Sequence, residues 1–110
     1  MKKYEVRISK FAESDINDII GYWIVKNRTF CFSLYDKLKS KISELGYFPE
    51  KGRIVPELEK NGIQNYKELI EGNYRIIYSI NMDVVSVLSI IDSRRNLEEI
   101  LIKKVIDYFE

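Results

Sequence analysis

Histidine is absent from the 110 residues of this chain, and cysteine occurs once, at Cys31. Without histidine, the chain cannot form Ser-His-Asp or Cys-His catalytic groupings or histidine-ligated metal sites. One cysteine excludes an internal disulfide and any zinc site built from several cysteines. Catalysis could therefore use only arginine, lysine, carboxylates, tyrosine or the lone thiol. We expect no metal and no other cofactor.

Long apolar runs are also missing. No stretch of the sequence reaches the ~18 apolar residues that a membrane-spanning helix needs. The first seven residues carry two lysines and then alternate charged with apolar side chains, whereas a secretory signal continues as a solid apolar block. We therefore expect a cytoplasmic protein with no membrane partner.

A clear excess of positive charge is missing as well. The 18 basic and 17 acidic side chains leave a net charge of +1. A protein that neutralises many phosphates usually carries a basic excess, so the composition gives no positive argument for nucleic acid, although a local basic patch stays open. With 45% hydrophobic residues the chain can bury a core, and its length predicts one domain over residues 1–110.

The spacing of apolar residues changes near the start of the chain. Apolar and polar residues alternate over residues 3–9, which predicts a half-buried strand. From Phe11 onward apolar residues recur every three or four positions as far as Trp23, which predicts an amphipathic helix. Ser9 is the expected N-cap of this helix, and the chain breaks at Asn27.

A second apolar stripe runs from Cys31 to Leu45. Gly46 follows it in the position of a C-cap glycine. So short a link between the two helices predicts an antiparallel hairpin. Cys31 belongs to the stripe, which favours a small core residue over a nucleophile, because no histidine is present to activate its thiol.

Three β-rich runs follow a long connection over residues 46–65, which holds both prolines. The runs are Tyr66–Ile70, Tyr74–Ile80 and Val84–Ile91. Their spacers are short enough for hairpins, so we expect an antiparallel meander. Asn96 and Glu99 form a capping-box-like start for a last helix. That helix carries the apolar residues Leu97, Leu101, Val105 and Tyr108.

The predicted order is therefore β-α-α-β-β-β-α. A helical hairpin packed on one face of an antiparallel sheet is an α+β arrangement. The first strand is separated from the second by more than 50 residues, so no tight turn can join them. Its partner in the sheet stays open.

Six sequence blocks, in this order and spacing, resemble the RelE/ParE superfamily of toxins. The blocks are Phe11–Ile16, Leu45–Pro49, Gly52–Leu58, Tyr66–Ile70, Gly72–Tyr78 and Asp92–Leu97. The resemblance covers nearly the whole chain and implies a RelE/ParE-like fold. It also implies a growth-inhibiting toxin of the kind linked to plasmid stabilization, neutralised by an antitoxin usually encoded beside it. In similar complexes the antitoxin lays a helix or an extended arm across the toxin.

The superfamily has two kinds of target, and fold alone does not separate them. RelE-like members cut mRNA in the ribosomal A site, and ParE-like members poison DNA gyrase. In the nuclease branch, the resemblance makes Arg75 the phosphate-holding residue, Glu57 a general base, and Lys67 and Arg95 further catalytic cations. An arginine that stabilises the fold by pairing with a carboxylate is the alternative interpretation of Arg75.

The nuclease pattern is incomplete in this sequence. A second catalytic lysine is expected at the position of Leu69, and the tyrosine that serves as the acid falls near Leu101, within an apolar stripe. Tyr108 lies farther along and is expected to pack. Without an acid, the cleavage mechanism lacks a component worth about 10²–10⁴-fold in rate.

The block Asp92–Leu97, followed by a helix, looks more like the ParE side. We therefore favour a gyrase-poisoning toxin, with a ribosome-dependent endoribonuclease as the alternative. A degenerate member that binds its antitoxin without inhibiting growth is a third possibility.

Four residues are candidates for binding rather than catalysis. Arg53, Arg94 and Arg95 are expected to contact the target. For Arg94 and Arg95, the alternative is pairing with nearby glutamates or capping of strand carbonyls. Trp23 is expected in the core, with antitoxin contact as its possible functional role.

Overall fold

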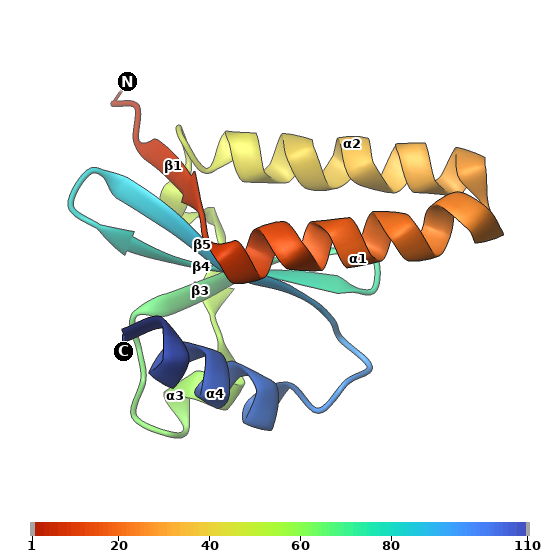
Figure 1. Cartoon of the computed structure of the whole chain (residues 1–110). Helices are drawn as coiled ribbons and strands as arrows, with labels where there is room; N and C mark the ends of the chain where they lie inside the picture. The colour runs from red at the N-terminus through yellow and green to blue at the C-terminus, as the bar shows by residue number, and fades with distance from the viewer. Residues whose placement is uncertain (1, 110) are drawn as a thin grey trace.

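The computed structural model describes residues 2–109, which form an α+β fold around one five-stranded sheet (Figure 1). The strands are β1 (Glu5–Ile8), β2 (Arg53–Ile54), β3 (Tyr66–Glu71), β4 (Tyr74–Asn81) and β5 (Val84–Asp92). The helices are α1 (Lys10–Lys26), α2 (Arg28–Glu44), α3 (Pro56–Glu59) and α4 (Leu97–Phe109), with a 3-10 turn η1 at Pro49–Lys51. Within residues 2–109 no helix is long and apolar enough to cross a lipid bilayer.

The strand order is β1-β5-β4-β3-β2, so the first strand pairs with the last. β3, β4 and β5 form the antiparallel meander predicted from their spacers. β1 runs parallel to β5, with Glu5 opposite Val84 and Ile8 opposite Val87. This pairing answers the question that the sequence left open.

The helical hairpin is antiparallel, as predicted (Figure 1). The Ser9 side chain caps α1 by accepting a hydrogen bond from the Ala12 N–H at 3.1 Å, which confirms the expected N-cap. Asn27 is at once the C-cap of α1 and the N-cap of α2, and its side chain accepts from the Phe30 N–H at 3.0 Å. One residue therefore makes the whole connection between the two helices.

Gly46 does not have the left-handed backbone of a C-cap glycine, so that prediction is wrong. Its N–H donates to the Ser43 carbonyl at 3.1 Å, and its carbonyl accepts from the Tyr4 N–H at 2.6 Å. A Cβ at this position would lie 3.3 Å from both the Ser43 and the Tyr4 carbonyl oxygens. The glycine is explained by the close approach of the chain that enters β1.

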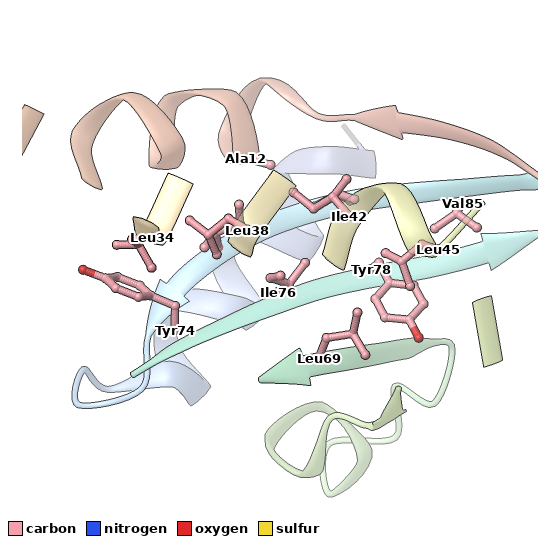
Figure 2. Close-up of a cluster of buried hydrophobic side chains, with 12 residues drawn as sticks. Ala12, Leu34, Leu38, Ile42, Leu45, Leu69, Tyr74, Ile76, Tyr78 and Val85 are labelled. Atoms are coloured by element: carbon pink, nitrogen blue, oxygen red, sulfur yellow. The ribbon is translucent and has the colours of Figure 1, made fainter. Parts of the chain in front are cut away.

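The α1–α2 hairpin covers one face of the sheet and encloses the larger core (Figure 2). Alternate residues of β4 and β5 face the stripe of α2 that the sequence predicted. The buried members are Ala12, Leu34, Leu38, Ile42, Leu45, Leu69, Tyr74, Ile76, Tyr78, Val85, Val87 and Ile90.

The opposite face of the sheet is covered as well, which the sequence did not predict. The connection over residues 46–65, expected to be a loop, contains η1, β2 and α3. α3 and α4 pack together beneath the sheet, on the side away from the helical hairpin (Figure 1). The buried members of this second core are Val55, Leu58, Tyr66, Ile77, Leu88, Ile91, Leu97, Leu101 and Val105.

Candidate functional site

Arg75 is buried between β4 and α3, with 8% of its side chain exposed. Its Nη1 and Nη2 atoms each donate a hydrogen bond of 2.7 Å to the Glu57 carboxylate, one to each oxygen. Its Nε donates to Glu68 Oε1 at 2.6 Å. The guanidinium is therefore held on two sides by carboxylates of the chain itself.

The second oxygen of Glu68 extends this ion network to the edge of the sheet. Glu68 is fully buried, and its Oε2 accepts from the Nε of Arg53 at 2.6 Å. The network thus contains two arginines and two glutamates, and it links β4, β3, β2 and α3. Because the charges balance, burial costs less than it would for an unpaired ion.

Glu57 and Arg75 stabilise each other's charged forms. The hydrogen bonds from Arg75 hold the pKa of Glu57 below its usual value, and the same bonds raise the pKa of Arg75. A carboxylate with a lowered pKa is a weaker general base. In this geometry a phosphate would have to displace Glu57 in order to reach Arg75. The pairing agrees with the alternative interpretation of Arg75 as a fold-stabilising residue.

The other proposed nuclease residues lie apart from Arg75. Lys67 precedes Glu68 on β3 and therefore points to the opposite face of the sheet, where its Nζ lies 3.5 Å from Glu50. Leu101 is fully buried in the second core, and the side chain of Tyr108 lies outside the described residues. The structure brings Arg75 and Glu57 together, but not Lys67 or Arg95.

Arg94 is fixed by Asp92 at the end of β5. The Asp92 carboxylate accepts from the Arg94 backbone N–H at 2.9 Å, from its Nε at 2.9 Å and from its Nη2 at 2.6 Å. These contacts lower the pKa of Asp92, and the hydrogen bond from the Arg94 side chain has the largest effect. Asp92 was not singled out from the sequence. Its only signal there is a carboxylate two residues before an exposed arginine.

The neighbouring Arg95 is exposed, and across residues 2–109 its side chain has no hydrogen-bond or ion-pair partner. Glu98 pairs instead with Lys60, at 2.7 Å. Arg53 lies on β2, and β3 and β4 separate it from β5. The three arginines expected to contact the target therefore do not form one group.

Trp23 lies at the rim of the larger core, close to Arg94. Its indole Nε1 donates to the Tyr74 hydroxyl at 2.8 Å, and its ring centroid is 4.5 Å from that of Phe30. A cavity of about 310 Å³ is bordered by all four of these residues. A groove of about 360 Å³ runs between α1 and the end of β5 and is also bordered by Tyr74, Arg94 and Arg95. Trp23 and the arginine pair thus share one surface.

Large apolar side chains are exposed near the junction of α1, α2 and β1. Ile8 and Tyr35 are 46% and 43% exposed, and they border a cavity of about 330 Å³ between these elements. Such a surface is typical of proteins that bind a partner.

Among the described residues, no cluster of three cysteine or carboxylate side chains could hold a metal ion.

Comparisons with known structures place the fold. A chain of the chromosomal ParDE toxin–antitoxin system from P. aeruginosa matches with a TM-score of 0.63 and 13% identity, over 80% of this chain and 94% of that chain. A chain of the toxin–antitoxin complex RelBE2 from Mycobacterium tuberculosis matches with a TM-score of 0.59 and 17% identity, over 84% of this chain and 93% of that one.

No curated protein matches the sequence. One protein family does, and its description is "ParE toxin of type II toxin-antitoxin system, parDE". It matches residues 6–97, from β1 to the first residue of α4. The chain therefore belongs to the ParE toxin family of type II toxin–antitoxin systems.

Proposed function

We propose that this chain inhibits growth by poisoning DNA gyrase and that a cognate antitoxin neutralises it in the cytoplasm. The observation that carries the choice of target is the mutual pairing of Arg75 and Glu57. Both would have to be free for RNA cleavage, the one to bind phosphate and the other to accept a proton.

The absence of histidine and the burial of Leu101 also support binding over cleavage. RNA cleavage needs an acid for the leaving oxygen, and at the expected position this chain has a buried leucine. A toxin that acts by binding needs no such group. It needs an exposed surface, and the surface around Trp23, Arg94 and Arg95 is the one we assign to the target.

An antitoxin partner is supported by the two similar structures, one from a ParDE toxin–antitoxin system and the other from a RelBE2 toxin–antitoxin complex. The exposed apolar residues beside the helical hairpin are a suitable surface for a protein partner. Binding of the antitoxin to the folded toxin would bury this surface.

Induction of the chain in a bacterial host, with DNA breaks and mRNA cuts followed in parallel, tests the target. We expect gyrase-dependent breaks, no site-specific cuts in ribosome-bound mRNA, and rescue by the protein encoded beside the toxin. Replacement of Arg94 and Arg95 by alanine should reduce the breaks without unfolding the chain, because both side chains lie on the surface.

The alternative function is a ribosome-dependent endoribonuclease. The structural similarity to a chain of the RelBE2 complex is the observation that favours it. Under that function Arg75, Arg95, Glu57 and Lys67 would act on the scissile phosphate. Site-specific mRNA cuts by purified wild type, lost in a folded Arg75→Ala variant, would replace our proposal with this one. If cells grow normally at high levels of the folded chain, both functions are wrong, and the chain is a family member that no longer inhibits growth.

A further inference from the structure

β5 is longer than the strand that flanks it. β1 pairs with β5 only from Val84 to Val87, whereas β5 continues to Asp92. Beyond Val87, the side of β5 that faces away from β4 is therefore a sheet edge. α1 satisfies part of this edge. Ser9 Oγ donates to the Leu88 carbonyl at 2.6 Å, and the Ile90 N–H donates to Asp15 Oδ2 at 2.9 Å.

The hydrogen-bond pattern between β4 and β5 shows which backbone groups point to this edge. Ser93 N–H donates to the Asn73 carbonyl at 2.7 Å, and the next opposed pair is Tyr74 with Asp92. Bonded and non-bonded pairs alternate along an antiparallel ladder. The backbone groups of Asp92, and by the same alternation those of Ile90, therefore point away from β4.

Ile90 and Asp92 each direct an N–H and a carbonyl toward the open edge, and two of these four groups have a hydrogen-bond partner within the chain. Asp15 takes the Ile90 N–H, and the Asp92 carbonyl accepts from the Arg95 N–H at 3.1 Å. Within residues 2–109, the Ile90 carbonyl and the Asp92 N–H have no partner. One acceptor and one donor thus flank Ile91 on the open edge.

A carbonyl and an N–H that flank one residue are the groups that a further neighbouring strand needs. In a parallel ladder, one residue donates to the carbonyl before its opposite residue and accepts from the N–H after it. β1 binds β5 in the same way, since Glu5 lies opposite Val84 and donates to the Asp83 carbonyl at 2.9 Å. An antiparallel strand would use the same two groups at a non-hydrogen-bonded pair, so the parallel direction is taken from β1, which already pairs with this side of β5 in that direction.

The groove between α1 and β5 gives this edge space and charge. Its volume is about 360 Å³, and Ile90 and Asp92 both line it. A segment parallel to β5 would direct its C-terminal end toward Arg94 and Arg95, which follow Asp92 in the chain. Asp15 and Asp18 line the other side of the groove. The unpaired backbone groups favour a peptide over a nucleic acid.

We propose that this groove binds an extended peptide segment of a protein partner as a short strand parallel to β5, with an acidic group near its C-terminal end facing Arg95. Arg95 is the better contact, since the carboxylate of Asp92 already neutralises Arg94. The inference rests on the proposed function in that a protein partner must exist, but its test requires neither gyrase nor the antitoxin.

The test follows backbone amide signals of the whole ¹⁵N-labelled chain by NMR during titration with a six-residue peptide. The peptide alternates threonine and valine and ends in two glutamates. We expect the Asp92 amide to shift and to become protected from hydrogen exchange, because its N–H gains an acceptor. Methylating the peptide nitrogens removes their donors and should weaken binding by roughly 2- to 10-fold, the value of one hydrogen bond.

The charge contact has its own variants. Arg95→Gln should weaken binding by about 2- to 5-fold, as expected for an exposed ion pair. Lys103→Gln, which removes an exposed cation on α4, should leave binding unchanged. The same peptide ending in two glutamines should bind the wild type as weakly as the acidic peptide binds Arg95→Gln.

Three results would overturn the inference: an Asp92 amide that does not shift at millimolar peptide, equal binding of the methylated peptide, or binding of a single-stranded oligonucleotide in its place. The proposed function can fail separately. A chain that binds the peptide but does not arrest growth would retain the inference and lose the function. A chain that arrests growth but does not bind the peptide would retain the proposed function and lose the inference.

Discussion

Asp15 on α1 and Lys104 on α4 belong to helices on opposite faces of the sheet, yet they meet around its edge. The Lys104 Nζ lies 3.3 Å from Asp15 Oδ1 and donates to Ser89 Oγ at 2.7 Å. Ser89 is fully buried, and its hydroxyl donates to Asp15 Oδ2. These three side chains connect the two helical layers through β5.

Lys104→Met should destabilise the fold, because it leaves Asp15 and Ser89 without their cation. We expect a loss of about 1–3 kcal/mol, the usual value of a hydrogen bond to a charged group, because Asp15 keeps its bonds from Ser89 and from the Ile90 N–H. Urea unfolding followed by circular dichroism measures it. Lys103→Met is the matched control, since Lys103 is exposed on the same helix. Equal stability of the two variants would mean that the connection contributes nothing.

Arg75→Met should cost more, about 3–5 kcal/mol, because it leaves the buried Glu68 charge without its main partner. Arg75→Lys should recover only part of this loss, since an ammonium cannot bind two carboxylates in the fork geometry of a guanidinium. Thermal unfolding of both variants measures the effect. A stable Arg75→Met variant would show that Arg75 is free for another role, and any loss of toxicity in that variant would then be functional.

The stability of the chain should fall in acid through Glu57. Its pKa is lower in the folded chain than its usual 4.5, so its contribution is present above that value and is lost as the pH falls through the folded pKa. Urea midpoints measured from pH 7 down to about pH 3 should therefore decline, and Glu57→Gln should show a shallower decline. Parallel curves for the two proteins would contradict this assignment.

Two glycines should respond in opposite ways to alanine. A Cβ at Gly52 would lie 2.6 Å from the Glu68 carbonyl oxygen and would also collide with the Tyr78 hydroxyl, so Gly52→Ala should cost about 1–3 kcal/mol. Gly21 lies within α1, and apart from its chain neighbours and its own helix backbone no atom lies within 4 Å of an added Cβ, so Gly21→Ala should gain about 0.5–1 kcal/mol. Melting temperatures of the two variants, compared with wild type, decide both predictions.

Antitoxin binding should raise the melting temperature of the toxin. A partner that binds only the folded chain, at about 100 times its Kd, adds about 2.7 kcal/mol to the free energy of unfolding. Calorimetry of the toxin alone and of the purified complex measures the change. An unchanged midpoint would mean that the antitoxin does not cover the folded surface.

Local patterns carried most of the fold prediction, because they depend on near neighbours in the sequence. Ser9, the α2 stripe and the two hairpin spacers each specify structure through contacts a few residues away. The pairing of β1 with β5 joins residues nearly 80 positions apart, such as Glu5 and Val84, and no local pattern encodes such a contact. The strand β2 and the short α3 escaped prediction for a related reason, since two to four residues show no periodicity.

The site was predicted residue by residue but not as an arrangement. The sequence marked Arg75 and Glu57, and the structure shows that they bind each other. Glu68 was missed because a glutamate in an otherwise apolar strand can face either solvent or a buried arginine, and its neighbours do not tell which. Arg53 and Arg95 were grouped by residue type, although two strands lie between them.

The single-residue connection at Asn27 constrains how the length of this chain could change. Inserting one residue there would turn α2 by about 100° relative to α1, because an α-helix has about 3.6 residues per turn. Leu34 and Leu38 would then leave the core, and Ser33 and Lys37 would take their places. An insertion at Met82, in an exposed turn between two strands, would displace no core residue. The β4–β5 turn at Met82 can therefore vary in length, whereas packing of α2 fixes the length of the α1–α2 connection at Asn27.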